Sequence, residues 1–329
     1  WSLAFDEVLG HELAREGFCR ALKRGRIAQG YLLAGPEGVG KGLLARQVAA
    51  ALLCPHSGVA SAAATEVEKC GECGSCLAVT SGNHGGLQIL TPGEGRGIDL
   101  AQIREMLRFL SLRSGEPRVV LVEPAERLAE AAANGLLKIL EEPPAGAVFL
   151  LVSHRPAQLL TTVVSRCQRV TMGPLALAPF LEVLKLHQLE GGMAERLYHG
   201  TGGRPGAALS LFEAIERCGG EQRFCAIISS PPDDPRDLVA LSSEDGGKPD
   251  REAVLATIGL LADGIWAYRG QDAMSRRLAA ERATLLAQVA RHVEWSGSPD
   301  LALEAAARIL SAQDPAELRF RLPRSLGVA

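Results

Sequence analysis

A glycine-rich stretch near the start of the chain has the residue types and spacing of a phosphate-binding loop. The letters GPEGVGKG occupy residues 35–42, after an apolar run at 31–34 and before a helical pattern at 43–53. A strand, G-x-x-x-x-G-K and a helix in this order are the setting of a Walker A motif. Backbone N–H groups of the loop and of the helix N-terminus bind phosphate oxygens there, and a lysine adds charge. The candidate phosphate contacts are Gly35, Gly38, Gly40 and Lys41.

Two positions that would handle magnesium in such a site carry unsuitable residues. ATP-hydrolysing loops place Ser or Thr after the lysine, because its hydroxyl ligates Mg²⁺, whereas this chain has Gly42. A Walker B motif would follow the apolar run 119–122 with two acids, but Glu123 takes the first position and Pro124 the second. We therefore expect no Mg²⁺ site and no independent ATPase activity. Lys41 and the glycines stay compatible with weak binding of ATP or ADP.

Four of the eight cysteines have the spacing of a metal site. Three of them are separated by two residues each, and the fourth lies upstream, before a small-residue insertion at 57–65. Four thiolates suit tetrahedral, structural Zn²⁺. The predicted zinc ligands are Cys54, Cys70, Cys73 and Cys76. The alternatives are His56 or His84 in place of Cys54, free thiols, or an iron–sulfur cluster, which the lack of a fourth nearby cysteine disfavours.

Strands and helices alternate along the first half of the chain. The predicted strands are 31–34, 87–90, 118–122, 147–152 and 168–171, and the longest apolar runs among them are 119–122 and 148–152. The helical patterns of this half are 5–28, 43–53, 100–112 and 128–141. Such alternation predicts the α/β class, with a mostly parallel sheet and helices on both faces.

After residue 173 the strand pattern stops. The helical patterns of this half are 175–189, 193–199, a stretch from 207, 254–268, 275–293 and 299–312, with a polar loop at 242–250. We predict three domains: a nucleotide-binding-type α/β domain at 1–173 with a zinc module at 54–76, a small helical lid at 174–212, and an all-α domain at 213–329.

Composition favours an ordinary soluble protein. Hydrophobic residues make up 47% and charged residues 22% of the chain. The net charge of -3 argues against a strongly basic nucleic-acid-binding surface. Apolar runs are of strand length, and the first residues have no signal-peptide pattern, so we expect a cytoplasmic location without membrane association.

Two arginines are further candidates for binding phosphate. Arg166 stands between Ser165 and Cys167, just before the strand predicted at 168–171. Arg204 lies in the turn 202–206, where it could sense a phosphate or simply belong to a Gly-Gly-Arg-Pro turn.

These motifs together resemble those of a known family. The loop GPEGVGKG, the four-cysteine module and two longer runs, EPAERLAEAAANGLLKILEEPP at 123–144 and FLLVSHRPAQLLTTVVSRC at 149–167, are similar to bacterial clamp-loader AAA+ subunits. The resemblance is dense over residues 5–173 and thin beyond them. Within the family, the altered loop and altered Walker B motif resemble the delta prime type. The ATP-hydrolysing gamma/tau type would keep GK[ST] and an Asp-Glu pair.

The resemblance implies a ring subunit of the DNA polymerase III assembly, with gamma/tau and delta subunits as partners. Such a ring opens a sliding clamp and places it on primed DNA. The match to Ser-Arg-Cys implies that Arg166 is an arginine finger, which reaches ATP held by a neighbouring gamma/tau subunit and acts in trans. The cysteines match the family's zinc module, and helices within 213–329 would form the collar that holds the ring together.

Two other functions share parts of this pattern. An active gamma/tau-type ATPase would need the missing magnesium-handling residues. A P-loop nucleotide kinase would need a metal ligand after Lys41 and an arginine-bearing lid for the substrate phosphate, neither of which is found.

Overall fold

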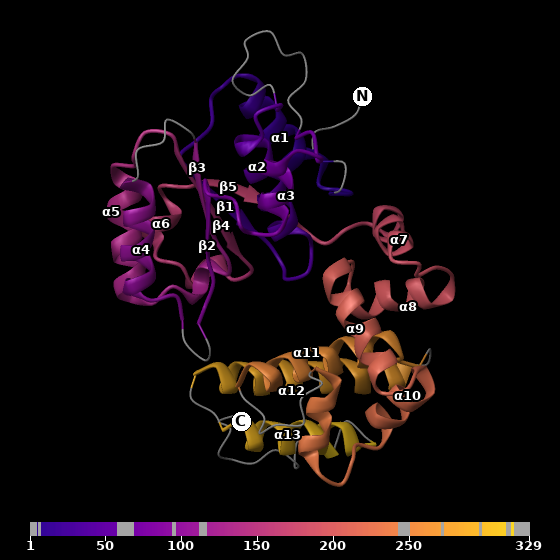
Figure 1. Cartoon of the computed structure of the whole chain (residues 1–329). Coiled ribbons are helices and arrows are strands. Elements are labelled where there is room, and N and C mark those ends of the chain that lie inside the picture. Colours follow the sequence, from indigo (N-terminus) through magenta and orange to yellow (C-terminus); the bar gives the residue numbers. More distant parts are fainter. Residues whose placement is uncertain are drawn as a thin grey trace. The chain divides into compact units, whose positions relative to one another are not determined.

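The computed structural model describes residues 5, 8–57, 69–93, 97–111, 117–242, 251–270, 273–295, 298–313 and 317–318. Most of the loops predicted at 57–65 and 242–250 lies outside the described residues, as does residue 112 at the predicted end of one helix. The chain forms two compact units, Trp1–Pro179 and Phe180–Ala329 (Figure 1).

The first unit is built on a parallel sheet. Its five strands are β1 Gly30–Ala34, β2 Leu87–Leu90, β3 Arg118–Val122, β4 Ala147–Ser153 and β5 Gln168–Thr171. Their order across the sheet is β2-β3-β4-β1-β5, and every neighbouring pair is parallel. The three inner strands are buried at every position, as the continuous apolar runs predicted.

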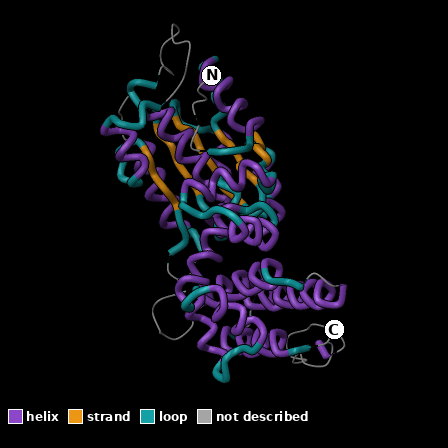
Figure 2. Tube along the Cα trace, turned by 90° about the vertical axis from the view of Figure 1, so that its right-hand side faces the viewer, coloured by secondary structure: helices purple, strands orange, loops and turns teal. Residues whose placement is uncertain are grey.

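Helices cover both faces of this sheet (Figures 1 and 2). On one side lie α1 Glu12–Lys23, α2 Lys41–Leu53 and α3 Gly74–Thr80, and on the other α4 Leu100–Ser111, α5 Glu130–Glu141 and α6 Thr161–Val164. Because side chains alternate along a strand, Tyr31 and Leu33 join the core under the first set, whereas Leu32 joins the core under the second. The unit is therefore a three-layer α/β structure.

The second unit is helical in its described residues. Helix α7 Leu177–Leu186 begins in the last residues of the first unit and continues into the second. The other helices of the second unit are α8 Gly192–Thr201, α9 Pro205–Arg217, α10 Glu221–Ser229, α11 Arg251–Ala267, α12 Ala273–Trp295 and α13 Pro299–Ser311, with a 3-10 helix η3 at Pro235–Leu241. The central element is α11, which contacts α8, α9, α12 and α13. The division into a lid and a separate all-α domain stays a prediction, and α9 runs across its boundary at residue 212.

The helix predicted at 128–141 begins later than its apolar pattern indicated. A 3-10 helix, η1 Ala125–Arg127, and an extended segment precede α5. In that segment the N–H of Ile98 donates to the carbonyl of Arg127 at 2.8 Å, and the N–H of Ala129 donates to the carbonyl of Ile98 at 2.9 Å. These backbone hydrogen bonds compete with helix formation.

Two more predicted helices are shorter than expected. Among the described residues of the pattern at 5–28, the helix is α1, and His11 precedes it with left-handed backbone angles, φ 56 and ψ 36. The pattern at 175–189 gives α7, which ends at Leu186 because Gln188 turns the chain with a φ of 61. Helical spacing of apolar residues did not reveal either left-handed residue.

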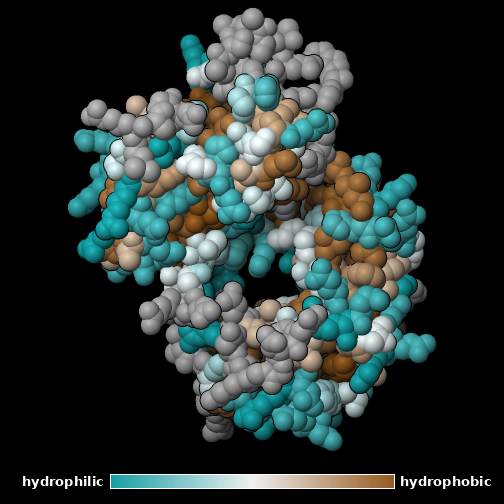
Figure 3. Space-filling model, in the orientation of Figure 1, coloured by the Kyte–Doolittle hydropathy of each residue, from teal (hydrophilic) through white to brown (hydrophobic). Residues whose placement is uncertain are grey.

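In the face that Figure 3 shows, hydrophilic residues cover much of the surface, and hydrophobic residues gather in several patches between them. The most exposed large ones are Leu13, Leu186 and Met274. No helix within the described ranges has the length and apolarity that crossing a bilayer requires.

Candidate functional site

The predicted phosphate loop connects β1 to α2. Two of its glycines are required by the backbone: a Cβ on Gly35 would lie 1.8 Å from the carbonyl oxygen of Met172, and Gly40 precedes α2 with a φ of 99. The loop therefore has the strand–loop–helix path that the sequence predicted, with backbone N–H groups at the start of α2.

Lys41 is folded onto this loop. Its Nζ donates to the carbonyl oxygen of Pro36 at 2.5 Å, and the residue is only 5% exposed. Burial lowers the pKa of Lys41, while the carboxylates of Glu126, Glu37 and Glu123 raise it. The ammonium group is thus placed at the loop, with acids around it.

The position next to Lys41 is closed by an ion pair. Arg46 Nη2 lies 2.9 Å from Oε2 of Glu123. A Cβ on Gly42 would lie 2.1 Å from Oε1 of Glu123 and 2.9 Å from Nη1 of Arg46. The space that a side chain on residue 42 would fill is therefore occupied by the carboxylate of Glu123 and the guanidinium of Arg46. Arg46 comes from the next turn of α2, and side chains on a helix lean back toward its N-terminus.

A second carboxylate lies at the end of β3. Glu126, on η1, has a side chain that is 3% exposed. Its Oε1 accepts the backbone N–H of His154 at 3.2 Å and lies 3.0 Å from His154 Nε2. Since β3 and β4 are neighbours in the sheet, their carboxyl ends bring these two residues together.

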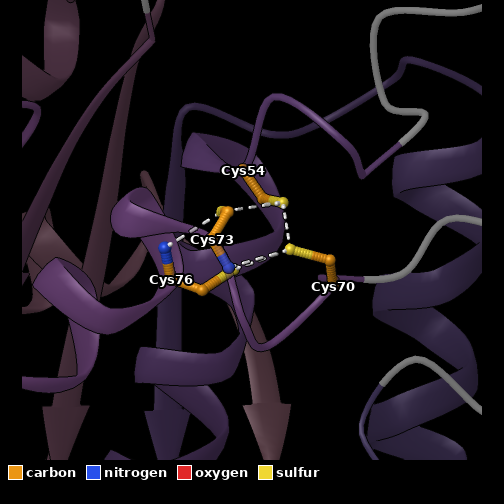
Figure 4. A group of neighbouring side chains, drawn as sticks. All are labelled: Cys54, Cys70, Cys73 and Cys76. Atoms are coloured by element: carbon orange, nitrogen blue, oxygen red, sulfur yellow. Dashed lines mark hydrogen bonds between the residues drawn. The ribbon is translucent and has the colours of Figure 1, made fainter.

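The four predicted cysteines converge (Figure 4). Cys54 ends α2, Cys73 precedes α3 and Cys76 lies in its first turn. All four Sγ atoms lie within 4.8 Å of one another. The Sγ–Sγ distance is 3.7 Å for Cys54 and Cys70, 3.8 Å for Cys54 and Cys73, and 3.9 Å for Cys70 and Cys76.

These distances are those of ligands around a common centre. Sulfurs at about 2.3 Å from a tetrahedral metal ion lie about 3.8 Å apart, whereas a disulfide would bring two of them to about 2.05 Å. The backbone N–H of Cys73 donates to Sγ of Cys70 at 3.3 Å, and the backbone N–H of Cys76 donates to Sγ of Cys73 at 3.4 Å. A charged thiolate accepts such hydrogen bonds. The cluster fits a metal ion.

The two histidine alternatives do not enter this cluster. His84 directs its Nδ1 to the N–H of Gly86 at 2.9 Å, and His56 is not among the converging ligands. Cys54 is the fourth member, because the end of α2 carries it directly beside the N-terminus of α3.

The two candidate arginines are held by acceptors within their own units. Arg166 donates through Nη2 to Glu141 and through Nη1 to the carbonyl of Thr162. Arg204 precedes α9 and donates to the carbonyl of Thr201 at 2.7 Å and to Asp263 at 2.5 Å. The phosphate-sensing role of Arg204 stays a prediction.

Comparison with known proteins assigns the first unit to a family. Residues 10–176 match the family model described as DNA polymerase III, delta subunit, and they are just over half of the chain. The chain belongs to the DNA polymerase III delta-subunit family.

Relatives of this delta-subunit family member include DNA polymerase III subunits of different names. DNA polymerase III subunit delta prime of Pseudomonas aeruginosa is 43% identical over 147 residues, which are 44% of this chain and 43% of that protein. DNA polymerase III subunit tau of Bacillus subtilis is 31% identical over 166 residues, which are 50% of this chain and 28% of that protein. The match thus spans less than half the length of these relatives.

One similar solved structure is that of a DNA polymerase III gamma subunit-related protein from Thermotoga maritima. The alignment covers 92% of this delta-subunit family member and 99% of the Thermotoga chain. The identity is 19% and the TM-score 0.47.

Three residues of this delta-subunit family member were not predicted from the sequence as parts of a site. These are Arg46, Glu126 and Glu141, each of which contacts a residue far away in the sequence. The spacing of Arg46, four residues after Gly42 on a helix, was an available signal, since such residues share a face. Nothing in the spacing of Glu141 and Arg166 pointed to their contact.

Proposed function

We propose that this chain is a delta prime-type AAA+ subunit of the DNA polymerase III clamp loader, which does not hydrolyse ATP itself. The observation that carries the proposal is the closed position beside Lys41: the Glu123 carboxylate lies 2.1 Å from where a Gly42 Cβ would be. A hydroxyl and a Mg²⁺ ion have no room there while Glu123 pairs with Arg46. The higher identity to a delta prime subunit than to a tau subunit supports the same assignment.

Arg166 would act on a neighbouring subunit. It lies at the end of α6, and its side chain is 35% exposed, so that its remaining N–H donors are open to a partner. A guanidinium that reaches ATP on a gamma/tau subunit stabilises charge on the transferred phosphoryl group, and such a finger is worth about 10³–10⁵ in rate. This chain would thus contribute to catalysis without its own active site.

The four cysteines would hold one structural zinc ion. The metal would cross-link the end of α2 to the start of α3. The measured distances between the cysteine sulfurs fit tetrahedral coordination. We assign no catalytic role to this site, because four thiolates leave no open coordination position.

The partners follow from the ring assembly. They are gamma/tau and delta subunits, the sliding clamp, and primed DNA through the complex, in the cytoplasm. Helices within residues 213–329 would form the collar, which needs an interaction surface and no catalytic residue.

Reconstitution with gamma/tau and delta subunits tests this function. The isolated chain should show negligible ATP turnover with Mg²⁺, and the assembled ring should hydrolyse ATP when clamp and primed DNA are added. Arg166→Ala should slow only the assembled ring, by about 10³-fold at the site it serves. An isolated chain that hydrolysed ATP at the rate of a gamma/tau subunit would support the active ATPase instead.

A further inference from the structure

The guanidinium of Arg166 is anchored on two separate helices. Its Nη2 donates to Oε1 of Glu141 at 2.5 Å, and its Nη1 donates to the carbonyl oxygen of Thr162 at 3.0 Å. Glu141 is the last residue of α5, and Thr162 belongs to α6. Two acceptors on two of its nitrogens fix the plane of a guanidinium, which a single acceptor leaves free to rotate.

The chain around Glu141 places its carboxylate there. Pro143 and Pro144 follow the end of α5, and a proline stops a helix because it lacks an N–H and restricts the residue before it. Helix α5 therefore ends beside α6, with which it is in contact. The backbone angles of Glu142, φ -130 and ψ 69, are no longer helical. Arg166 pairs with the residue before it, Glu141.

The pair does little for the stability of the fold. The two side chains are 35% and 43% exposed, and exposed ion pairs gain little because solvent screens them and ordering long side chains costs entropy. The direction of a catalytic group, by contrast, strongly affects rate, since a misplacement of about 1 Å costs on the order of 10²-fold.

We propose that Glu141 is a positioning residue for Arg166. Its carboxylate holds the guanidinium at the end of α6 in the orientation in which the remaining N–H groups reach the phosphates of the neighbouring subunit's ATP. This inference rests on the proposed role of Arg166 in trans. In this proposal Glu141 acts only through the guanidinium of Arg166.

The test compares Glu141→Ala and Glu141→Gln with a matched control, Glu142→Ala, in the full chain assembled with gamma/tau and delta subunits. ATP turnover is measured at saturating clamp and primed DNA. Glu141→Ala should lower kcat about 10-fold, with KM for ATP unchanged within a factor of about 2. Glu141→Gln keeps an oxygen acceptor without the charge and should fall between Glu141→Ala and the unmodified chain. Glu142→Ala should leave kcat unchanged, and all three variants should keep the Tm of the isolated chain.

A double variant separates positioning from other effects. Glu141→Ala should lower kcat no further once Arg166→Ala is present, because both changes act through one guanidinium. An additive loss, or an unchanged or raised kcat in Glu141→Ala, would overturn the positioning role while leaving Arg166 as the finger. If Arg166→Ala had no effect on the ring, the proposed function of Arg166 would itself be wrong.

Discussion

Arg46 and Glu123 form an ion pair of 2.9 Å directly over the backbone of Gly42. One residue belongs to the first turns of α2 and the other follows the end of β3. In an ATP-hydrolysing loop, the residue at position 42 supplies a hydroxyl and the end of β3 supplies an acid for Mg²⁺. Here a guanidinium neutralises the acid instead, and the absence of a side chain on residue 42 leaves room for the pair.

Gly42→Ser alone should therefore not create an ATPase. The new side chain would displace Glu123 and Arg46, whose flexible ends can move, and Ser is favoured over Gly in a helix. We expect the free energy of unfolding to change by about 1 kcal/mol or less. Steady-state turnover of the isolated chain with Mg²⁺ should stay at background, because Pro124 still replaces the second acid.

Gly42→Ala is the matched control, since it fills the same space without a hydroxyl. Both variants should behave alike in turnover and in ATP binding with or without Mg²⁺. Magnesium-dependent turnover in Gly42→Ser but not in Gly42→Ala would show that the lost hydroxyl is by itself the reason for inactivity. Pro124 would then have no part in it.

Removing one cysteine of the cluster should remove the metal. Purified chain should contain one zinc ion, and Cys73→Ser should lose most of it because three thiolates and a hydroxyl bind zinc more weakly. The Tm should fall by about 5 °C or more, since the proposed metal would join α2 to α3. Cys225→Ser, which changes a cysteine of α10 outside the cluster, should alter neither zinc content nor Tm. Metal analysis measures the zinc content, and thermal melts measure the Tm. Purified wild-type chain that contains no zinc would contradict the predicted zinc site.

Local patterns predicted all five strands of the sheet, and the continuous apolar runs belong to the three inner strands, which are buried at every position. The bounds of β2, β3 and β5 were predicted to the residue, and the cysteine spacing predicted which four sulfurs converge. Contacts such as Arg46 with Glu123 and Arg166 with Glu141 depend on how separate elements pack. A single sequence carries no direct signal for such pairs, because exposed charges are common on every helix.

Arg282 should stabilise the helical unit at the end of α13. Its Nη2 donates to the carbonyl oxygens of Leu310 at 2.7 Å and Ala312 at 2.6 Å, which are among the groups a helix end leaves without partners. Arg282→Met should lower the free energy of unfolding by about 1–3 kcal/mol. Arg277→Met, on the same helix but exposed and paired with Glu281, should cost about 0.5 kcal/mol or less. Equal losses in chemical denaturation would contradict the capping role.

His11 should make stability depend on pH below neutrality. Its Nε2 lies 2.9 Å from the carbonyl oxygen of Val39, in the loop that connects β1 to α2. Burial lowers the pKa of His11, and Lys41 acts in the same direction, whereas the Val39 hydrogen bond and Glu12 raise it. As the pH falls through about 6.5, His11 is therefore protonated in the unfolded chain before it is protonated in the folded chain.

The stabilising effect of neutral His11 is thus present above that pH and is lost as the pH drops toward the folded pKa, by at most about 1.4 kcal/mol per pH unit. His11→Gln should flatten the decline in unfolding free energy between about pH 7 and pH 5.5, whereas His187→Gln, which changes an exposed histidine of the other unit, should not. Denaturant titrations at several pH values measure both slopes. If the unfolding free energy of His11→Gln declined as steeply as that of the unmodified chain, a group other than His11 would cause the pH dependence.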